Sequence, residues 1–186
     1  MDFWTKQEFN TFIEGVKDKP QSYAAFMTLY YTGMRIGELM ALTSSDITDT
    51  TITINKSYTR LNCRGIITTP KTPKSNRTIT IPKLLHECLA QYQVALYDLQ
   101  PDARLFEFTK HFLVHEMRRG CKSTGVKKIR LHDLRHSHAS LLIELGFSPL
   151  LIAERLGHEK METTLNTYGH LYPSKQSEIA TALDNL

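Results

Sequence analysis

The chain has 186 residues, with 23 lysines and arginines against 19 aspartates and glutamates, which gives a formal net charge of +4. This length supports one domain with a hydrophobic core, and the charge permits a polyanionic partner without requiring one. Three scattered cysteines argue against a disulfide framework, and no apolar run has the length of a membrane span or the place of a signal peptide. We therefore expect a cytoplasmic protein in a reducing compartment.

The first part of the chain is predicted to be helical. Thr5 and Glu8 have the spacing of a capping box, and apolar residues follow them at a helical period. Residues 23–31 are apolar on nearly all sides, which predicts a buried central helix. Gly33 ends that helix, and Arg35 then lies at the start of a short helix, where free backbone N–H groups favour an anion.

The hydrophobic period changes to two after residue 50. Residues 51–55, 65–69 and 77–81 alternate polar and apolar β-formers, which predicts a three-stranded antiparallel sheet. The hairpin between the last two strands would carry Lys71 and Lys74.

Helical patterns return after Pro82, and no repeat or low-complexity linker interrupts them. We therefore expect one mainly helical α+β domain with a small sheet set in it. The predicted helices cover residues 84–99, 109–121, 131–145, 149–156, 163–167 and 174–186.

Polar residues that rarely form a core gather in the second half of the chain. His132 and Arg135 are three positions apart, so they share one face of a helix. Leu156-Gly157-His158 follows, and Tyr168 comes ten residues after this histidine. One arginine can bind two phosphate oxygens at once, a histidine can donate or accept a proton near neutral pH, and a tyrosine oxygen can be a nucleophile. The set indicates binding of a phosphodiester and attack on it.

These motifs resemble the C-terminal boxes of the tyrosine site-specific recombinases, the phage integrase family. Thr32-Gly33-Met34-Arg35-Ile36-Gly37-Glu38-Leu39 resembles the first arginine box of that family. Residues 70–78, Pro-Lys-Thr-Pro-Lys-Ser-Asn-Arg-Thr, resemble its lysine hairpin. Four boxes in the order and spacing of the family cover most of the chain.

The resemblance implies a DNA strand-transfer enzyme that uses no metal, nucleotide or other cofactor. The nucleophile would attack the scissile phosphorus, which leaves a 3′-phosphotyrosyl bond and a free 5′-hydroxyl, and a second 5′-hydroxyl could then religate. The implied catalytic residues are Tyr168 as nucleophile, Arg35 and Arg135 on the non-bridging oxygens, Lys71 as general acid, His132 as acid or base near the tyrosine, and His158 as a phosphate hydrogen-bond donor.

Other residues receive lesser roles. Glu38 and Asp133 are expected to support the active site through hydrogen bonds, whereas His136 and His138 are expected to be structural. Lys74 remains an alternative to Lys71 as general acid. The basic residues near position 128 could be a solvated helix end or a phosphate contact. The implied DNA-binding residues are Lys74, Arg77, Lys127, Lys128 and Arg130.

Three other functions compete with recombination. The first is a catalytically idle DNA-binding module of the same fold, and the second is a type IB-like topoisomerase that only relaxes DNA. The third is a metal-dependent phosphodiesterase, since His132 and His136 have zinc-ligand spacing on a helix. No glutamate stands next to the first histidine as it does in metalloproteases, so no metal site is expected.

Family members normally carry N-terminal core-binding and arm-binding domains, so residues 1–186 are expected to be the C-terminal catalytic domain alone. Its affinity for double-stranded attachment-site DNA should be weak and strongly salt dependent. The resemblance also implies a monomer when free and a homotetramer on DNA. The last helix would pack either on its own domain or on a neighbour. The sequence around Tyr168 resembles integrases of phages and mobile elements. This resemblance implies that the protein acts in the cytoplasm of a bacterial host, at the nucleoid.

Overall fold

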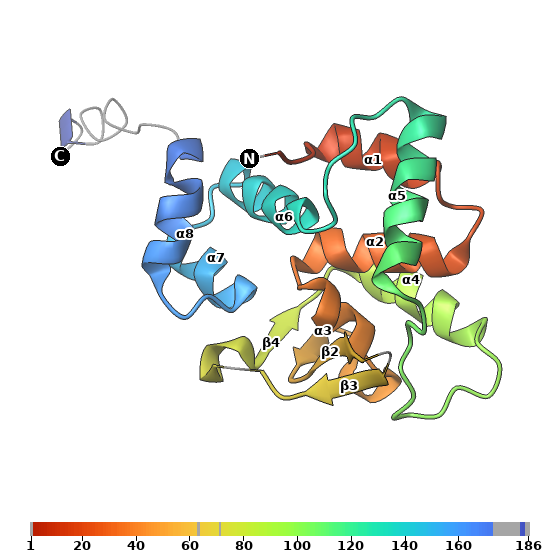
Figure 1. Ribbon diagram of the computed structural model, residues 1–186. Coiled ribbons are helices and arrows are strands. Elements are labelled where there is room, and N and C mark those ends of the chain that lie inside the picture. Colours follow the sequence, from red (N-terminus) through yellow and green to blue (C-terminus); the bar gives the residue numbers. More distant parts are fainter. Residues whose placement is uncertain (1, 63, 71, 173–182, 185–186) are drawn as a thin grey trace.

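The computed structural model describes residues 2–62, 64–70, 72–172 and 183–184 (Figure 1). Helices dominate it and small antiparallel sheets complete it, so the predicted fold class is confirmed. None of the described helices is long and apolar enough to cross a membrane. The α-helices are α1 (Lys6–Glu14), α2 (Pro20–Thr32), α3 (Ile36–Ala41), α4 (Lys83–Val94), α5 (Lys110–Thr124), α6 (Asp133–Glu144), α7 (Pro149–Leu156) and α8 (Met161–Tyr168). The strands are β1 (Thr51–Ile54), β2 (Ser57–Leu61), β3 (Arg64–Thr68) and β4 (Arg77–Thr80), and single 3₁₀ turns are η1 (Ser44–Asp46), η2 (Pro73–Ser75) and η3 (Gly169–Leu171).

Helix α2 is the centre of the larger apolar core, as its sequence predicts. It packs against α1, α4 and α6, and nine of its 13 residues are buried. Phe9 of α1 stacks on Tyr30 of α2 with ring centroids 3.6 Å apart. The predicted capping box starts α1, because Thr5 accepts a hydrogen bond from Glu8 N while the Glu8 carboxylate accepts one from Thr5 N. The packing of α2 in this core fixes the position of its last residue, Thr32, and Arg35 comes three residues later.

The predicted three-stranded sheet is wrong in its strand count and pairing. The structure has two separate two-stranded sheets, in which β1 pairs with β4 and β2 pairs with β3. The sequence analysis missed β2 (Ser57–Leu61), which takes the place beside β3. Pro70 and Pro73 lie between β3 and β4, and proline has no N–H for a sheet ladder. A direct β3–β4 hairpin is therefore replaced by a longer loop.

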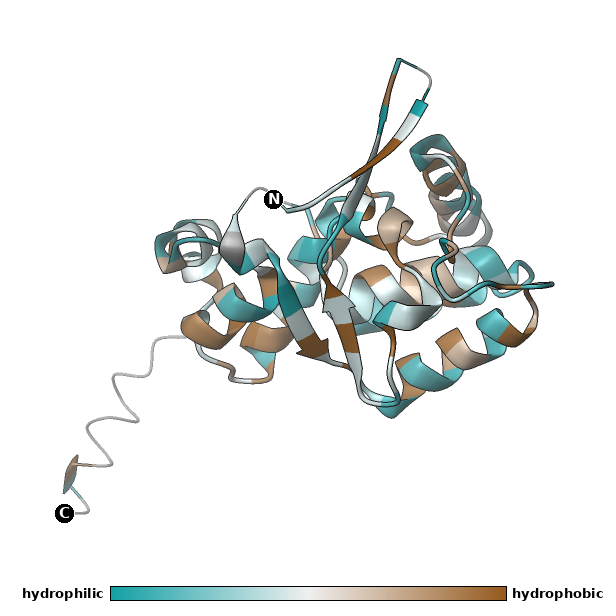
Figure 2. Cartoon of the chain, turned by 90° about the horizontal axis from the view of Figure 1, so that it is seen from below, coloured by the Kyte–Doolittle hydropathy of each residue, from teal (hydrophilic) through white to brown (hydrophobic). Residues whose placement is uncertain are grey.

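The β2–β3 ribbon extends away from the helices (Figure 2). Every residue of β3 is exposed, including Ile67 at 52%, and Leu61 at the end of β2 is 59% exposed. Only the start of β2 packs on α3, and the rest of the ribbon has no buried face to impose an alternating pattern. For this reason β2 carried no clear strand signal.

Helices α6, α7 and α8 lie together on one side of the molecule (Figure 1). They share a small apolar cluster, which is separate from the larger core. The helix predicted at residues 163–167 is longer than expected and includes Tyr168 as its last residue. The helix predicted at residues 174–186 lies largely outside the described residues. The members of the small cluster are Ala139, Ile143, Ile152, Leu156 and Tyr168.

Gly33 ends α2 in the left-handed conformation, with φ of 65°. A Cβ atom at this position would lie 2.7 Å from His138 Cδ2 and 2.7 Å from Leu156 Cδ2. The close approach brings the end of α2 against α6 and α7. Only glycine satisfies both the backbone angle and the space.

Gly33→Ala is therefore expected to reduce the free energy of unfolding by about 2–4 kcal/mol, the sum of left-handed strain and overpacking. Gly146→Ala is the matched control, since Gly146 also has positive φ but nothing lies within 4 Å of the added Cβ. Urea denaturation of both variants separates the packing contribution from the backbone contribution. Equal losses for the two variants would contradict the close packing at Gly33.

Candidate functional site

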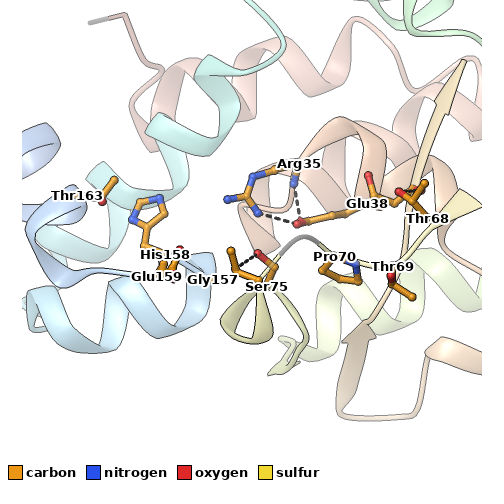
Figure 3. Close-up of a pocket in the computed structure, with 12 residues that line it drawn as sticks. Arg35, Glu38, Thr68, Thr69, Pro70, Ser75, Gly157, His158, Glu159 and Thr163 are labelled. Carbon is orange, nitrogen blue, oxygen red and sulfur yellow. Dashed lines mark hydrogen bonds and ion pairs between the residues drawn. The ribbon is translucent and has the colours of Figure 1, made fainter. Parts of the chain in front are cut away.

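A cleft of about 430 Å³ opens between α3, the chain after β3 and the start of the loop that follows α7 (Figure 3). Arg35 and Glu38 come from the α3 side, and His158 comes from the opposite side (Figure 3). Pro70 and Ser75 belong to the loop between β3 and β4, which forms another wall. The structure therefore brings together the first arginine box, the lysine hairpin and the Leu-Gly-His box that the sequence singled out.

Arg35 immediately precedes α3, and its side chain is 41% exposed. Its Nη1 donates to Glu38 Oε1 at 2.8 Å, and its backbone N–H donates to Glu38 Oε2 at 2.8 Å. The carboxylate thus closes the first turn of α3 and fixes the guanidinium at the same time. An arginine held in place but still exposed is well suited to bind an anion in the cleft.

Glu38 is 6% exposed and has a second arginine partner, Arg77 of β4. Arg77 donates to both carboxylate oxygens, at 2.9 and 3.3 Å. Burial alone would raise the pKa of Glu38, but the hydrogen bonds and charges of Arg77 and Arg35 outweigh it and lower this pKa. Glu38 is therefore charged and makes the expected hydrogen bond with Arg35, while its supporting role in the reaction stays a prediction.

Arg77 was predicted from the sequence to contact DNA at the surface. In the structure it is buried, with a side chain that is only 7% exposed. Besides Glu38, it donates from Nε to Arg155 O at 2.9 Å and from Nη1 to Ser75 O at 3.1 Å. Its donors are thus used inside the protein instead of on the surface. Arg77 joins the first arginine box, the β3–β4 loop and the end of α7, and it does not present an exposed DNA contact.

Arg135 is 4% exposed and holds two helix ends together. Its Nη1 donates to Gly33 O at 2.8 Å, beyond the end of α2, and its Nη2 donates to Leu156 O at 2.6 Å, at the end of α7. Carbonyls at helix C-termini lack intrahelical partners and carry partial negative charge. Burial, followed by the charge of Arg35, lowers the pKa of Arg135 to about 9, so it stays charged at neutral pH.

Tyr168 is 1% exposed and lies within the small apolar cluster. Burial raises its pKa to about 12, although the charge of Arg135 acts in the opposite direction. Its Oη lies 2.8 Å from Nδ1 of His136, and no contact with His132 accompanies this one among the described residues. The histidine that contacts Tyr168 in this structure is therefore His136, and the acid or base role expected of His132 stays a prediction.

Helix geometry explains why His136, and not His132, contacts Tyr168. His132 and His136 are four residues apart, so both project from nearly the same face of α6. Their rings meet edge to face with centroids 5.2 Å apart, and only His136 is one turn further along the helix, level with the end of α8. The spacing was visible in the sequence, but the position of α8 was not.

His158 lines the cleft, and its Nδ1 lies 2.8 Å from Thr164 Oγ1 of α8. Burial, and then the charges of Arg135 and Arg35, lower its pKa to about 4, so it is neutral at pH 7. If the threonine hydroxyl donates to Nδ1, the proton resides on Nε2 and is available to a phosphate oxygen. Thr164, for which no role was predicted from the sequence, is therefore the hydrogen-bond partner that can select the tautomer of His158.

His138 lies inside the protein, and its structural role stays a prediction. It is 3% exposed, and its Nε2 accepts a hydrogen bond from Arg155 Nε at 3.0 Å. Arg155 also donates to Tyr31 O at 3.0 Å and to Thr80 O at 2.9 Å, which ties α7 to α2 and β4. The sequence analysis gave Arg155 no role.

The predicted surface contacts are placed as follows. Asp133 is buried and accepts hydrogen bonds from the backbone and side chain of Arg130, whose side chain is 78% exposed. Lys127 pairs with Glu8 at 3.2 Å, whereas Lys128 and Lys74 are exposed. Lys71 lies outside the described residues, so the choice between Lys71 and Lys74 stays a prediction.

The cleft carries more positive than negative charge. Arg35 lines it, and the buried Arg77 and Arg135 lie close by, against two lining carboxylates, those of Glu38 and Glu159. The charges of Arg35 and Arg77 both lower the pKa of Arg135. An anion entering beside Arg35 would meet this excess charge and the neutral His158. Within the described ranges, no group of three or more histidine, cysteine or acidic side chains could hold a metal ion. The arrangement favours a phosphate group as ligand.

Comparisons with known proteins agree with this geometry. The sequence model of the family described as "Phage integrase family" matches residues 2–175. The ICEBs1 integrase of Bacillus subtilis is 38% identical, over 100% of this chain and 55% of that protein. Transposase A from transposon Tn554 of Staphylococcus aureus is 30% identical, over 78% of this chain and 42% of that protein. The chain spans about half the length of the curated relatives it matches.

Solved structures share the fold. The Tn1549 transposon integrase, solved in complex with circular intermediate DNA, superposes with a TM-score of 0.77 and 20% identity, over 99% of this chain and 66% of that one. The catalytic domain of bacteriophage HP1 integrase gives a TM-score of 0.69 and 23% identity, over 100% of this chain and 96% of that one. At these identities, the likeness establishes the architecture.

Proposed function

Because this chain belongs to the phage integrase family, we propose that it is the catalytic part of a site-specific recombinase that cuts and rejoins duplex DNA. The observation that carries the proposal is the cleft in which Arg35, held by Glu38, faces His158 beside the buried Arg135. This excess of positive charge suits a phosphodiester, whose negative charge grows in the transition state.

Tyr168 is the proposed nucleophile. Its Oη attacks the scissile phosphorus, the bond to the 5′-oxygen breaks, and a 3′-phosphotyrosyl bond stores the energy for rejoining. Arg35 binds the non-bridging oxygens, the buried Arg135 adds its positive charge from beside the cleft, and the Nε2–H of His158 donates to one of these oxygens. Lys71 protonates the leaving 5′-oxygen. The protein itself supplies every group in this scheme, so it requires neither a metal ion nor ATP.

The burial of Tyr168 adds a condition to this scheme. A phenol that is 1% exposed cannot reach a DNA phosphate until the groups around it move. Tyr168 ends α8, which packs on α7 through the small apolar cluster, so α8 has to shift relative to its neighbours to uncover it. We propose that engagement of DNA provides this shift.

The proposed partner is double-stranded DNA containing an attachment site, bound in the bacterial nucleoid. The structures of the Tn1549 transposon integrase in complex with circular intermediate DNA and of the XerH recombinase bound to a difH substrate support DNA as the partner here. We propose a monomer in isolation and a homotetramer on DNA. Lys74, Lys127, Lys128 and Arg130 are the proposed contacts to the DNA backbone.

The test is to incubate the protein with supercoiled plasmid in EDTA, stop the reaction with SDS, digest the products and search for a nucleotide on Tyr168 by mass spectrometry. We expect an adduct on Tyr168 in the wild-type protein and none in Tyr168→Phe. Formation in EDTA would separate this chemistry from a metal-dependent phosphodiesterase. Absence of an adduct from wild type, at high protein concentration and also with a nicked duplex, would refute strand cleavage by this chain.

Rejoining between DNA molecules distinguishes a recombinase from a type IB-like topoisomerase. We expect the wild-type adduct to transfer its strand to an added duplex that carries a free 5′-hydroxyl end. Relaxation of the plasmid without any transfer would favour the topoisomerase instead.

A further inference from the structure

The base of the β2–β3 ribbon forms one wall of the cleft. Ser57 begins β2 and Thr68 ends β3, and these two cleft residues are partners in the strand register. Thr68 Oγ1 also donates to Ser57 O at 3.3 Å. Pro70 continues the wall beyond β3, and the two lysines considered as general acid follow it in the sequence (Figure 3). The position of the ribbon base therefore decides where the loop with these lysines begins.

Only the start of the ribbon is held by the rest of the protein. Ser57 and Tyr58 are half-buried, whereas the other residues of β2 and all of β3 are exposed. Helix α3 packs on this start, and a Cβ atom on Gly37 would lie 3.0 Å from Tyr58 O. A segment with few buried contacts moves at little cost in free energy. The direction of the ribbon therefore depends on the few side chains that hold its base.

Tyr58 is one of these side chains, and Arg104 holds it. The Cζ atom of Arg104 lies 4.2 Å from the centre of the Tyr58 ring, which is within the range of a cation–π contact. The same ring lies against Gly65 of β3, where an added Cβ atom would be 2.6 Å from Tyr58 Cε2. One guanidinium therefore acts on both strands of the ribbon.

Arg104 is itself fixed beside α3. Its Nη1 donates to Met40 O of α3 at 3.1 Å, and the next residue, Leu105, donates from its backbone N–H to Leu42 O at 2.9 Å. Leu105 is 1% exposed and belongs to the larger core, so the backbone at Arg104 is anchored there. Helix α3 begins directly after Arg35. Arg104 thus joins the helix that follows the phosphate-binding arginine to the ribbon that forms another wall of the cleft.

We propose that Arg104 is a positioning residue for protonation of the leaving group, an inference that rests on the proposed function. Through Tyr58 it fixes the ribbon, and the ribbon base fixes the start of the loop that supplies the general acid. Loss of this contact should slow the proton transfer, because the acid is then held less often within reach of the leaving oxygen. Binding of DNA should hardly change.

The step that depends on Arg104 is the departure of the 5′-oxygen. As the bond from Tyr168 Oη to phosphorus forms, the bond from phosphorus to this oxygen breaks with its electron pair. The oxygen takes a proton from the Lys71 ammonium, which becomes a neutral amine, while the phenol proton passes to His132. Arg104 exchanges no proton in either transfer.

The test uses duplexes that contain the site cleaved by the wild-type protein. Sequencing of the plasmid ends at the Tyr168 adduct identifies the scissile phosphate. Synthetic duplexes with this sequence then carry either oxygen or sulfur as the bridging 5′ atom. Quenched-flow measurement gives the rate of adduct formation, and fluorescence anisotropy gives the affinity.

The first arm compares Arg104→Gln, which removes the cation, with Arg104→Lys, which keeps it. On the oxygen duplex at saturating concentration, we expect adduct formation to slow about 10-fold in Arg104→Gln and less than about 3-fold in Arg104→Lys. The affinity of both variants for the duplex should stay within about 2-fold of wild type. Thermal unfolding checks that the fold persists. A loss of affinity with an unchanged rate at saturation would overturn the inference.

The second arm repeats the measurement on the sulfur duplex. A thiol has a pKa near 8.5, so a thiolate departs without a proton and needs no general acid. Arg104→Gln should then match wild type within about 2-fold. Arg35→Lys is the matched control, because its defect lies in binding the phosphate oxygens and should persist with sulfur. A defect of Arg104→Gln that remains on the sulfur duplex would refute a role in leaving-group protonation.

The third arm asks whether Arg104 acts through Tyr58. Tyr58→Leu should slow the oxygen duplex as much as Arg104→Gln does, and the double variant should be no slower than either single one. Tyr58→Phe keeps the ring and should recover most of the rate lost in Tyr58→Leu. Additive losses would show that the two residues act separately, which contradicts the inference.

The inference and the proposed function fail in different ways. If wild type forms the Tyr168 adduct and Arg104→Gln is equally fast on the oxygen duplex, only the inference fails. If wild type forms no adduct, the proposed function fails with it.

Discussion

Arg35→Ala is expected to slow formation of the Tyr168 adduct by about 10³-fold, since the guanidinium stabilises charge that develops on the phosphate. The fold should hardly change. The Arg35 side chain is 41% exposed, and Glu38 keeps its buried partner Arg77. Loss of a half-exposed partner, while the buried carboxylate stays paired, should therefore cost only about 1 kcal/mol. Quenched-flow measurement of the adduct, together with urea denaturation, checks both halves of this expectation.

Arg35→Lys is the control for charge. It keeps the positive charge but loses the planar pair of donors, so its rate should lie between those of wild type and Arg35→Ala. Binding of a labelled duplex, measured by fluorescence anisotropy, separates weaker binding from slower chemistry. A wild-type rate in Arg35→Ala would exclude Arg35 from the phosphate site.

Arg35→Ala should change the rate more than the stability, whereas Arg77→Ala should mainly reduce the stability. We expect Arg77→Ala to lower the free energy of unfolding by about 3–5 kcal/mol, because it removes one partner of a buried ion pair. Arg77 is 7% exposed and binds the same carboxylate as Arg35. Its loss also leaves Arg155 O and Ser75 O without this donor. Urea denaturation measures the effect directly.

Arg35→Ala is the matched comparison for Arg77→Ala, because the two variants remove an exposed and a buried partner of one glutamate. Arg77→Lys should recover part of the stability through its charge but not the contacts to the two carbonyls. Equal unfolding free energies for Arg35→Ala and Arg77→Ala would show that burial does not decide the strength of these pairs.

The sequence predicted the parts of the site that are local in the chain. Arg35 and Glu38 lie within one helical turn, and the pattern around them defines the start of α3. Gly157 and His158 follow α7 in the same way. Helix periodicity also located most of the helices, because a buried face repeats with the turn of the helix.

Contacts between distant segments were beyond the reach of the sequence. Whether His132 or His136 meets Tyr168 depends on where α8 packs along α6, which no local pattern encodes. Arg77 looked like a surface cation because its partners, Glu38 and Arg155 O, come from elements far away in the chain. Strand β2 was missed because most of it lies exposed beside β3 and only its start packs on α3, a contact that no local pattern encodes.

The two apolar cores of the molecule are joined by arginines as well as by packing. Arg135 and Arg155 bind the end of α2 to α6 and α7, and Arg77 binds β4 to α7. Polar links of this kind are exchanged for water more readily than a continuous apolar interface is. The part of the protein that carries Tyr168 can therefore behave as a cooperative unit of its own, opening without melting the larger core. The nucleophile and the arginine that binds its target would then belong to different folding units.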